Sequence, residues 1–582
     1  MDRPARWLLP QIAAGRAERL SETLNISLLA ARVLAGRGFD DPDSARRFLA
    51  PSLDNLHDPD LMLGMSSALE RLRRAISERE KILLYGDYDV DGTTSVVILK
   101  KAIELAGGAA DYHIPNRLRD GYGMRAEAIE EAAAAGTKLI ISVDTGIRAA
   151  EAVCHARKLG MDVIVTDHHL PDHQLPPALA VLNPNQPECP YPEKNLCGVG
   201  VAFKLVQALL GTLGWPDGKV RRMTESFLKL VAIGTVADVV PLTGENRILV
   251  KHGLEGLRSP RNPGLKALLS VAGFQPGSMP SAGQVAFRIA PRLNAAGRMA
   301  DANDIVNLLF TDDEERAREI ASRLHDLNSE RQETERAIVR AILDECLATP
   351  VTDSHAALVF CGRDWHRGVV GIVASRIVEK FHRPVFVLGE DAEQGIAQGS
   401  GRSIPCFHLL EALETMPELF LRFGGHRQAA GVALAPERVD EFRERLNSYA
   451  AARLRPEDFR AEVKVDAALR LDEITEAVVA DVLAMAPFGC GNPAPVFAVL
   501  GAEVAAPPVV WKEKHLRLTL RQNNRIVSVK AWNSADRAAE LPQGARVDAA
   551  VVLENDDYSA SRGYPGWCAV LRDVRPACSE SA

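Results

Sequence analysis

The sequence has little cysteine, few aromatic residues and no long uninterrupted apolar run. Its nine cysteines are scattered over 582 residues without a C-x-x-C pair, a pattern that is typical of reduced intracellular thiols and not of a disulfide framework. No apolar run reaches the ~18 residues that a membrane-spanning helix needs. The opening residues 1–4 (MDRP) show no signal-peptide pattern. We therefore expect a soluble cytoplasmic protein with no membrane segment.

An excess of basic residues is also missing. The chain has 69 Lys and Arg against 77 Asp and Glu, which gives a formal net charge of −8. This balance excludes a basic surface over the whole protein, although local patches decide whether a protein binds nucleic acid. The hydrophobic content of 47% is ordinary for a globular protein, and the length indicates about three or four domains of ~150 residues each.

Short apolar runs alternate with helical patterns from about residue 80 to residue 240. The runs 81–85, 138–143 and 162–166 are rich in Ile and Val, as parallel strands buried on both faces are. Such an alternating series predicts a doubly wound α/β domain with a parallel sheet. The helical patterns lie at 93–106, 125–135 and 147–159, and each one is followed or ended by glycine.

Acidic and histidine residues stand at the point where each of these strands ends. Ligands bind at the carboxyl ends of the strands in an open parallel sheet, so we expect these side chains to share one crevice. A further apolar run, 230–237, is interpreted as a strand that delivers Asp238 to the same place. The other residues are Asp87, Asp89 and Asp91 after the first strand, Asp144 after the second, and Asp167, His168 and His169 after the third.

This cluster predicts a divalent metal centre. So many carboxylates cannot share a small volume as bare anions, because like charges raise each other's pKa. Oxygen and imidazole ligands without thiolate suit Mn²⁺ or Mg²⁺. Asp89 and Asp91 could serve different ions and Asp144 could bridge them, in a two-metal site that stabilises both oxygens of an in-line phosphoryl displacement. The simpler interpretation, in which each Asp caps the following helix, does not explain two adjacent histidines.

The rest of the chain divides into further segments. Apolar residues at helical spacing over 311–346 predict one long connecting helix, and strands expected at 357–360 and 384–388 indicate a second α/β domain. Alternating leucines at 516, 518 and 520, followed by an Asn-Asn turn, predict a small C-terminal β-barrel. The expected domains are an N-terminal extension (1–50), a catalytic domain (51–310), the connecting helix (311–348), a substrate-binding domain (349–455) and an oligonucleotide-binding barrel (456–582).

Two groups of residues outside the cluster are candidates for binding a substrate. The glycine-rich segments 399–403 and 424–431 could cradle a phosphate with backbone N–H groups and a planar guanidinium, or be ordinary tight turns. The segment 291–299 could line a cleft or only cap the following helix. The candidate residues are Arg402, Ser403, Gly424, Gly425, His426, Arg292, Asn294 and Arg298.

The predicted barrel contains a local basic patch. Residues 510–546 include eight Lys and Arg against three acidic residues, with Trp511, His515 and Trp532 among them. Basic groups along a backbone and aromatic rings for stacking are what sequence-neutral single-strand binding requires. We select Trp511, Arg517 and Arg521 as candidates, while Trp532 could equally complete the barrel core.

The strand-end cluster resembles the DHH phosphoesterase family. Asp89 and Asp91 match its first motif, Asp144 the second and Asp238 the fourth, and the third motif, which names the family, is matched by 167–169. The segment 424–426 resembles the DHHA1 domain that accompanies this family. Tyr85 stands where many members carry a histidine, and Asp87 could complete that ion's coordination directly or through water. Four stretches, 85–92, 291–299, 424–431 and 487–495, and the C-terminal β segment are similar to the family's single-strand-specific exonucleases.

The resemblance implies a metal-dependent exonuclease that degrades single-stranded DNA from the 5′ end to 5′-mononucleotides, in DNA repair and recombination. It implies two Mn²⁺ or Mg²⁺ ions, and a single-strand binding protein and a RecQ-like helicase as partners, and we expect a monomer. Asp167 would orient a histidine, and His169 would contact the scissile phosphate or act as an acid, unless it is a structural histidine. The implied metal ligands are Asp89, Asp91, Asp144, His168 and Asp238, with Asp87 in addition.

Three alternatives remain open at this point. The first is a DHH enzyme that acts on short oligoribonucleotides or small phosphoesters. The second is a haloacid-dehalogenase-like phosphatase, because residues 89–94 (DVDGTT) also resemble the first motif of that family, with Asp89 as a covalent nucleophile. The third is a replication scaffold without activity.

Overall fold

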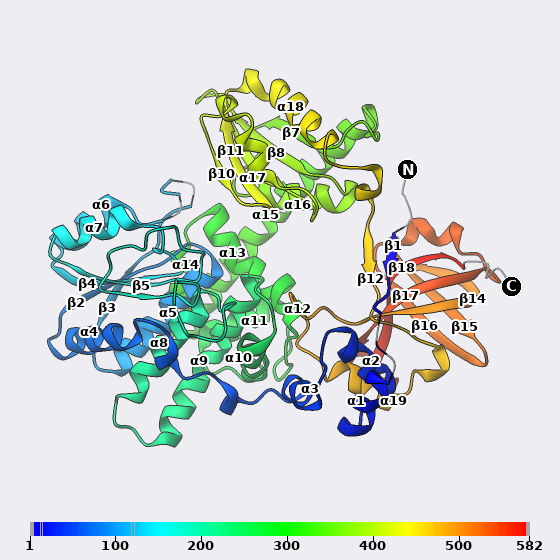
Figure 1. The fold of residues 1–582 in the computed structure, drawn as a ribbon, viewed down its shortest axis with the longest axis horizontal. Coiled ribbons are helices and arrows are strands. Elements are labelled where there is room, and N and C mark those ends of the chain that lie inside the picture. The colour runs from blue at the N-terminus through cyan, green and yellow to red at the C-terminus, as the bar shows by residue number, and fades with distance from the viewer. Residues whose placement is uncertain (1–4, 12, 14, 118, 122, 578–582) are drawn as a thin grey trace. The chain divides into compact units, whose positions relative to one another are not determined.

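The computed structural model describes residues 5–11, 13, 15–117, 119–121 and 123–577 (Figure 1). Residues 1–4, which show no signal-peptide pattern in the sequence, lie outside the described residues. The chain divides into two compact units, one formed by residues 55–459 and the other by the residues up to 54 together with those from 460 onward. No helix in the described part is both long and apolar enough to span a membrane.

A five-stranded parallel sheet begins the first unit. β2 pairs with β3 on one side and with β4 on the other, so the carboxyl ends of β2 and β4 flank the point where the strand order reverses. The sequence predicted β2, β4, β5 and their parallel arrangement, and it missed β3 and β6, which are only four and three residues long. The sheet order is β3 (Ala110–His113), β2 (Lys81–Tyr85), β4 (Thr137–Val143), β5 (Asp162–Thr166) and β6 (Ala180–Leu182).

Helices cover both faces of this sheet (Figure 1). α6 (Ala126–Ala134) and α7 (Ala150–Lys158) pack on one face, over Ile140 and Val163. α5 (Val90–Leu105) and α8 (Gly198–Gly211) pack against each other and against β4 on the other face. Both faces of each central strand are therefore buried, which stabilises the layer by about 1.5–3 kcal/mol for each large apolar side chain.

A helical region follows the sheet and corrects one prediction. The run 230–237, which we interpreted as a strand, forms the last two turns of α9, so that prediction was wrong. These turns are buried because α9 packs against α5, α8 and α10, and a run that is apolar on all sides cannot be told from a buried strand by its periodicity. The helices of this region are α9 (Asp217–Ala237), α10 (Gly244–Gly256), α11 (Pro263–Val271), α12 (Ala282–Gln284), α13 (Ala290–Met299) and α14 (Asn303–Phe310).

One long helix, α15 (Glu314–Ala348), then leads to the second α/β domain, as the sequence predicted. It packs on α11 and α13 and, farther along, on α16 (Val370–Phe381). The mixed sheet that follows has the order β10-β11-β9-β8-β7, and only β7 and β8 are parallel. Its strands are β7 (Leu358–Arg363), β8 (Val385–Asp391), β9 (Ile396–Arg402), β10 (Arg422–Gly425) and β11 (Ala429–Leu434), with α17 (Leu409–Glu414) and α18 (Val439–Ala451) as helices.

The glycine-rich segments of this domain lie largely on strands, not in the loops that we expected. Residues 399–402 belong to β9, and Gly424 and Gly425 end β10. Glycine is needed there by close packing: a Cβ at Gly399 would lie 2.0 Å from the carbonyl oxygen of Val387, and one at Gly401 would lie 2.5 Å from the ring of Phe386.

The second unit contains the expected small barrel. β14 pairs with both β15 and β17, and β16 and β18 complete the circuit, so the sheet closes on itself. The predicted Asn523-Asn524 turn joins β15 and β16, and the closed barrel confirms the expected oligonucleotide-binding fold class. The strands are β13 (Ala467–Ala468), β14 (Val496–Trp511), β15 (His515–Gln522), β16 (Arg525–Ala531), β17 (Arg546–Asn555) and β18 (Trp567–Pro576).

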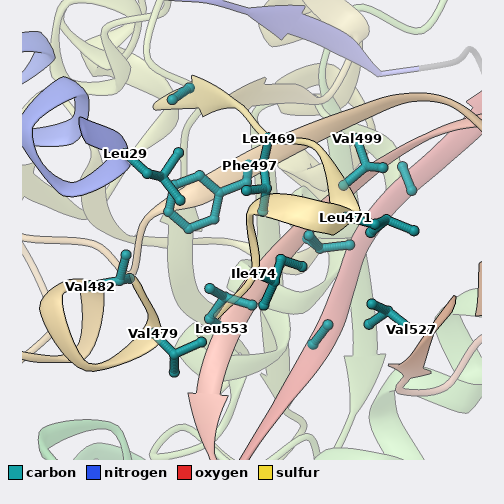
Figure 2. Packing of buried hydrophobic residues seen from close by; sticks show 14 of the residues in the cluster. Leu29, Leu469, Leu471, Ile474, Val479, Val482, Phe497, Val499, Val527 and Leu553 are labelled. Carbon is teal, nitrogen blue, oxygen red and sulfur yellow. The ribbon is translucent and has the colours of Figure 1, made fainter. Parts of the chain in front are cut away.

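The N-terminal segment that we interpreted as an extension shares the core of this barrel. Its helices are α1 (Arg16–Leu24), α2 (Leu28–Gly36) and α3 (Pro42–Leu49), and β1 (Arg6–Leu8) pairs with β12 (Glu462–Lys464). Leu29 of α2 points toward Phe497 of β14, close to Val479 and Val482 of α19 (Glu476–Leu483) (Figure 2). A partly buried ion pair of 2.9 Å between Arg37 and Asp466 adds a second connection.

We expect Leu29→Ala to destabilise the barrel by about 2–5 kcal/mol, because it removes a buried side chain from the shared core. Hydrogen exchange of the β14 and β17 amides measures this effect, and protection there should fall while protection in β2 and β4 does not change. The control is Leu28→Ala on the same helix, because Leu28 is 37% exposed. Equal protection of β14 in the wild type and in Leu29→Ala would show that α2 is not part of the barrel core.

Candidate metal centre

The loop after β2 leads directly into α5 and carries three carboxylates. Asp89 caps α5 and accepts a hydrogen bond from the Gly92 N–H at 2.9 Å. Asp91, in the first turn, is 1% exposed and accepts the N–H groups of Gly198 at 2.6 Å and Val199 at 2.7 Å. These N–H groups begin α8, where the helix dipole also favours a negative charge. Burial and the charge of Asp89 nevertheless raise the pKa of Asp91 to about 7.

Asp144 follows β4 in a left-handed backbone conformation with φ of 60°. Such a conformation costs a non-glycine residue about 1–3 kcal/mol and occurs most often at functional sites. The Asp144 N–H donates to the Thr166 carbonyl at 2.9 Å, which fixes the turn. α8 approaches so closely that a Cβ on Gly198 would lie 2.7 Å from Asp144 Oδ1. Burial and the surrounding carboxylates raise the pKa of Asp144 well above its ordinary value.

Asp167 is saturated by hydrogen bonds from the protein itself. It accepts the N–H groups of Ile147 at 2.9 Å, His168 at 2.7 Å and His169 at 3.1 Å, and its Oδ1 lies 2.7 Å from His169 Nδ1. Burial alone would raise the pKa of Asp167, but the hydrogen bond and charge of His169 and the backbone donors outweigh it and lower the pKa. This geometry favours the orienting role for Asp167, with His169 as the histidine that it holds.

His168 points into the carboxylate cluster. Its Nε2 lies 3.2 Å from Asp144 Oδ1, 3.7 Å from Asp238 Oδ2 and 3.9 Å from Asp91 Oδ2. This nitrogen is buried and makes no hydrogen bond to any residue that the structure describes. Burial, with the charge of His169, lowers the pKa of His168 to about 4. The ring is therefore neutral near pH 7, which is the form that binds metals.

Asp238 reaches the cluster from the C-terminal end of α9 and not from a strand. Burial and the charge of Asp91 raise its pKa to about 9. The structure thus brings together all six residues proposed as ligands, although one of them comes from an element of the wrong type. Three sets have ligand atoms within 4.8 Å of one another: Asp87, Asp89 and Asp144; Asp91, His168 and Asp238; and Asp144, His168 and His169.

Tyr85, the departure from the family pattern, lies outside these sets. It is fully buried, and its hydroxyl donates to the Gly123 carbonyl at 3.2 Å and accepts from the Arg125 N–H at 3.1 Å. Asp87 is only 5% exposed and belongs to one set. Its Oδ1 has no hydrogen-bond partner within the described part of the chain, and burial and Asp89 raise its pKa to about 8. The position of Asp87 therefore suits the coordinating role that we expected for it.

The donor sets fit divalent Mn²⁺ or Mg²⁺. They contain carboxylate oxygens and imidazole nitrogens and no thiolate, which is the composition that these ions accept. Two of the atoms, His168 Nε2 and Asp87 Oδ1, are buried and make no hydrogen bond to any described residue. A buried polar atom without a partner costs about 1–3 kcal/mol, so a bound cation would remove a penalty that the protein alone leaves.

Arginines from both α/β domains gather beside this centre. Burial and the charges of Arg117, Arg331 and Arg402 lower the pKa of Arg298 to about 10, whereas the charge of Asp89 opposes the shift. Arg298 of α13 donates to the Gly368 carbonyl at 3.1 Å. Guanidinium groups that repel one another in a buried place are suited to bind phosphate.

Of these arginines, Arg298 and Arg402 were predicted from the sequence, and two neighbours, Arg117 and Arg331, were not. Arg117 follows β3, a strand too short to be recognised, so its place at the sheet edge was not visible. Arg331 lies in the middle of α15, where charged residues are frequent on the exposed face, and its burial has no local signal. The Arg402 guanidinium donates to the Ser400 hydroxyl at 2.9 Å, which fixes that side chain beside β9.

The structure also shows the surroundings of the other candidates. Arg292 turns toward α15, with Nε 3.2 Å from His325 Nδ1. The Ser403 hydroxyl donates to the Phe407 carbonyl at 2.9 Å, which indicates a structural role. Asn294 is half-buried on α13. Gly424, Gly425 and His426 are exposed around the β10–β11 turn, where the His426 N–H donates to the Ala429 carbonyl at 2.8 Å.

Three aromatic rings form a cluster on the barrel, far along the chain from the metal centre. The ring centroids of Trp511 and Trp532 are 5.4 Å apart, and those of His515 and Trp532 are 5.0 Å apart. Trp532 is 49% exposed, so it does not complete the barrel core. Arg517 is exposed on β15, and Arg521 forms an ion pair of 2.6 Å with Glu503.

The parallel sheet and its strand-end carboxylates define a metal-dependent phosphoesterase of the DHH class. Models of known families match the DHH family N-terminal domain at residues 81–235, the DHHA1 domain at 353–452 and the RecJ OB domain at 465–564. The chain belongs to the RecJ exonuclease family. This result sets aside the haloacid-dehalogenase-like alternative.

The relatives that support this assignment cover most of the chain. A Bacillus subtilis (strain 168) protein named single-stranded-DNA-specific exonuclease RecJ is 40% identical over 93% of this chain and 67% of its own length. The protein of the same name from Escherichia coli (strain K12) is 41% identical over 75% of this chain and 77% of its own. The crystal structure of Thermus thermophilus RecJ with Mn²⁺ has a TM-score of 0.83 and 32% identity, covering 100% of this chain and 81% of that one. RecJ from the same organism has also been solved with Mg²⁺.

We expect the affinity for Mn²⁺ to rise with pH between about pH 6 and about pH 9, because the ion must displace protons from the carboxylates. The pKa values of Asp91 at about 7, Asp87 at about 8 and Asp238 at about 9 place these protons in that range. Calorimetric titration in two buffers of different ionisation enthalpy measures both the affinity and the protons released. A pH-independent affinity without proton release would contradict the raised pKa values.

We expect Gly198→Ala to weaken metal binding by about 10–100-fold, as changes to groups that orient metal ligands do. The new Cβ would meet the Asp144 carboxylate and disturb the N–H groups that hold Asp91. Gly211→Ala, at the other end of α8, is the matched control, because no atom lies within 4 Å of the position of its Cβ. Unchanged metal affinity in Gly198→Ala, measured by titration calorimetry, would show that this close approach is not required.

Proposed function

We propose that the protein is a metal-dependent exonuclease that hydrolyses single-stranded DNA from the 5′ end to 5′-mononucleotides, in DNA repair and recombination. The observation that carries the proposal is the pair of buried ligand sets that meet at Asp144 and His168. Its relatives are named single-stranded-DNA-specific exonucleases, and they match the catalytic region and the barrel alike. Smaller DHH enzymes, the first alternative, lack the barrel.

Two ions are part of the proposal. Asp87, Asp89 and Asp144 would hold one, and Asp91, His168 and Asp238 the other, with Asp144 close to both. Two divalent ions held by these sets would supply charge stabilisation for the attacking and the leaving oxygen of an in-line displacement at phosphorus. Asp144 fixes the distance between the two sets, because its backbone turn and the start of α8 leave its carboxylate little freedom.

His169 has the properties of a proton donor in this reaction. Burial lowers its pKa, but the hydrogen bond and charge of Asp167 outweigh burial and raise it. The ring therefore retains its proton to a higher pH than a free histidine does, and the hydrogen bond of 2.7 Å between Nδ1 and Asp167 fixes its orientation. We assign His169 the role of donating this proton to the phosphate or to the leaving oxygen.

The arginines beside the centre would hold the DNA backbone. Burial and the charge of Arg117 lower the pKa of Arg402 in the DHHA1 domain, and burial with the charges of Arg117, Arg331 and Arg402 lowers the pKa of Arg298. The proximity of these arginines within one unit favours a cleft that admits a single strand and is too narrow for a duplex. We further propose that the protein acts as a monomer, on DNA that a RecQ-like helicase has opened and that single-strand binding protein covers.

We expect Asp144→Asn to abolish hydrolysis, because it removes the carboxylate that belongs to one ligand set and lies 3.2 Å from His168 of the other. The measurement uses single-stranded oligonucleotides labelled at the 5′ or the 3′ end, with Mn²⁺ or Mg²⁺. The wild type should release the 5′ label at once as a mononucleotide, and EDTA should stop the reaction. Asp111→Asn, an exposed carboxylate on β3, is the control and should retain full activity.

Other outcomes of this experiment identify the alternatives. Release of the 3′ label first would contradict the proposed polarity. Intact long strands with cleavage of dinucleotides or of a small phosphoester would indicate the smaller type of DHH enzyme. No hydrolysis of any phosphoester by the wild type with either metal would support the scaffold without activity.

We expect Trp532→Ala to weaken binding to long single strands by about 1–3 kcal/mol, the contribution of one stacked base. Hydrolysis of a dinucleotide, for which the metal centre alone would suffice, should not change. Trp215→Ala in the catalytic unit serves as the control, because this ring packs on Lys219 and lies outside the barrel. Equal binding of a long strand by wild type and Trp532→Ala, measured by fluorescence anisotropy, would exclude the aromatic cluster from DNA binding.

A further inference from the structure

A second cavity lies in the helical region of the first unit, away from the metal centre. It has a volume of about 620 Å³ and is bordered by α5, α9, α14 and the connection between α10 and α11. Lys101 of α5 and Lys229 of α9 line it. They stand ten and nine residues from Asp91 and Asp238, which corresponds to about 15 Å and about 14 Å along each helix. The cavity is therefore separate from the site described above.

The wall of this cavity is positively charged. Arg222, Lys229 and Arg261 line it, and none of them forms an ion pair with any acidic side chain that the structure describes. Of the two acidic residues in the wall, Glu225 is already paired with Arg221 at 2.9 Å, and the other, Asp312, is exposed. The cations consequently outweigh the acidic groups that remain available inside the cavity.

Lys229 shows that these charges affect one another. It is half-buried, and burial together with the charge of Arg261 lowers its pKa. Arg261 is exposed beside the partly buried Lys229, and two neighbouring cations repel each other unless an anion lies between them. A phosphate group carries the charge and the acceptor oxygens that both side chains require.

The floor of the cavity is apolar and includes an aromatic ring. Val97, Phe227 and Leu309 are buried there, and Phe310 adds a ring at the rim. The ammonium groups of Lys100 and Lys101 lie 5.3 Å and 5.8 Å from the centroid of Phe310. The volume is within the range of about 300–1,000 Å³ that small-molecule sites have, and it exceeds what a single phosphate ion would fill.

We propose that this cavity binds a nucleoside phosphate, with its phosphates against Arg222, Lys229 and Arg261 and its base on the apolar floor. A free phosphate would use only the basic wall, and an uncharged nucleoside only the floor. A nucleoside phosphate is the class of small molecule that uses both. The inference is independent of the proposed exonuclease reaction, because none of these residues belongs to the metal centre or to the arginine group beside it.

The test is calorimetric titration of the full-length protein with dATP in the presence of EDTA, so that no metal ion holds the nucleotide at the catalytic centre. We expect saturable binding, and a Kd at least about tenfold higher for the double variant Lys229→Met, Arg261→Ser, a loss equivalent to about 1.4 kcal/mol. Arg258→Ser is the matched control, because Arg258 is exposed nearby and does not line the cavity. Far-UV circular dichroism verifies that each variant is folded.

Titrations with inorganic triphosphate and with deoxyadenosine separate the contributions of wall and floor. Both should bind more weakly than dATP. No saturable binding of dATP by the wild type, or an unchanged Kd in the folded double variant, would overturn the proposal. Inorganic triphosphate that binds as tightly as dATP would also overturn it, because the site would then recognise the anion alone.

Discussion

The repulsion between buried carboxylates is the constraint on which the catalytic region depends. Asp87, Asp91, Asp144 and Asp238 all have raised pKa values because they share a volume with little water. Three features hold them there: the carboxyl ends of parallel strands, the strained turn at Asp144, and the first N–H groups of α8. None of these features removes the charge. Bound divalent cations would remove this charge. The arrangement of the carboxylates in the fold therefore depends on the cofactor.

The positions of most ligands in this centre could be predicted because they follow from short segments of sequence. A short run of Ile and Val followed by Asp gives both the strand and the residue at its end, and parallel pairing then gathers these ends at one edge. Asp238 reached the correct place for the wrong reason. The last turns of α9 are buried among three helices, and a helix that is apolar on every side loses the periodicity that distinguishes it from a strand.

The features that escaped prediction depend on contacts that are distant in sequence. α2 has an apolar face, but nothing in residues 28–36 indicates that its partner is β14, more than 450 residues away. The groups that hold Asp91 are backbone N–H groups, which no particular side chain marks in the sequence. Only the glycine at position 198 indicates that α8 approaches closely there. The glycines of β9 resemble a phosphate-binding loop, and only the sheet pairing shows that they allow close packing.

The distribution of charge explains how a chain with a net charge of −8 can act on DNA. Without metal, those carboxylates of the centre that are ionised would repel the phosphates of a strand, because the acidic groups are concentrated where the scissile bond must lie. Bound divalent ions reverse the sign of that local field, and the neighbouring arginines then act with it. The barrel differs, because its basic residues and its aromatic cluster are not part of the metal-ligand sets. On the proposed function, affinity for the strand in the barrel would be independent of metal, whereas placement of the scissile phosphate would require it, so separate parts of one chain would govern the two steps.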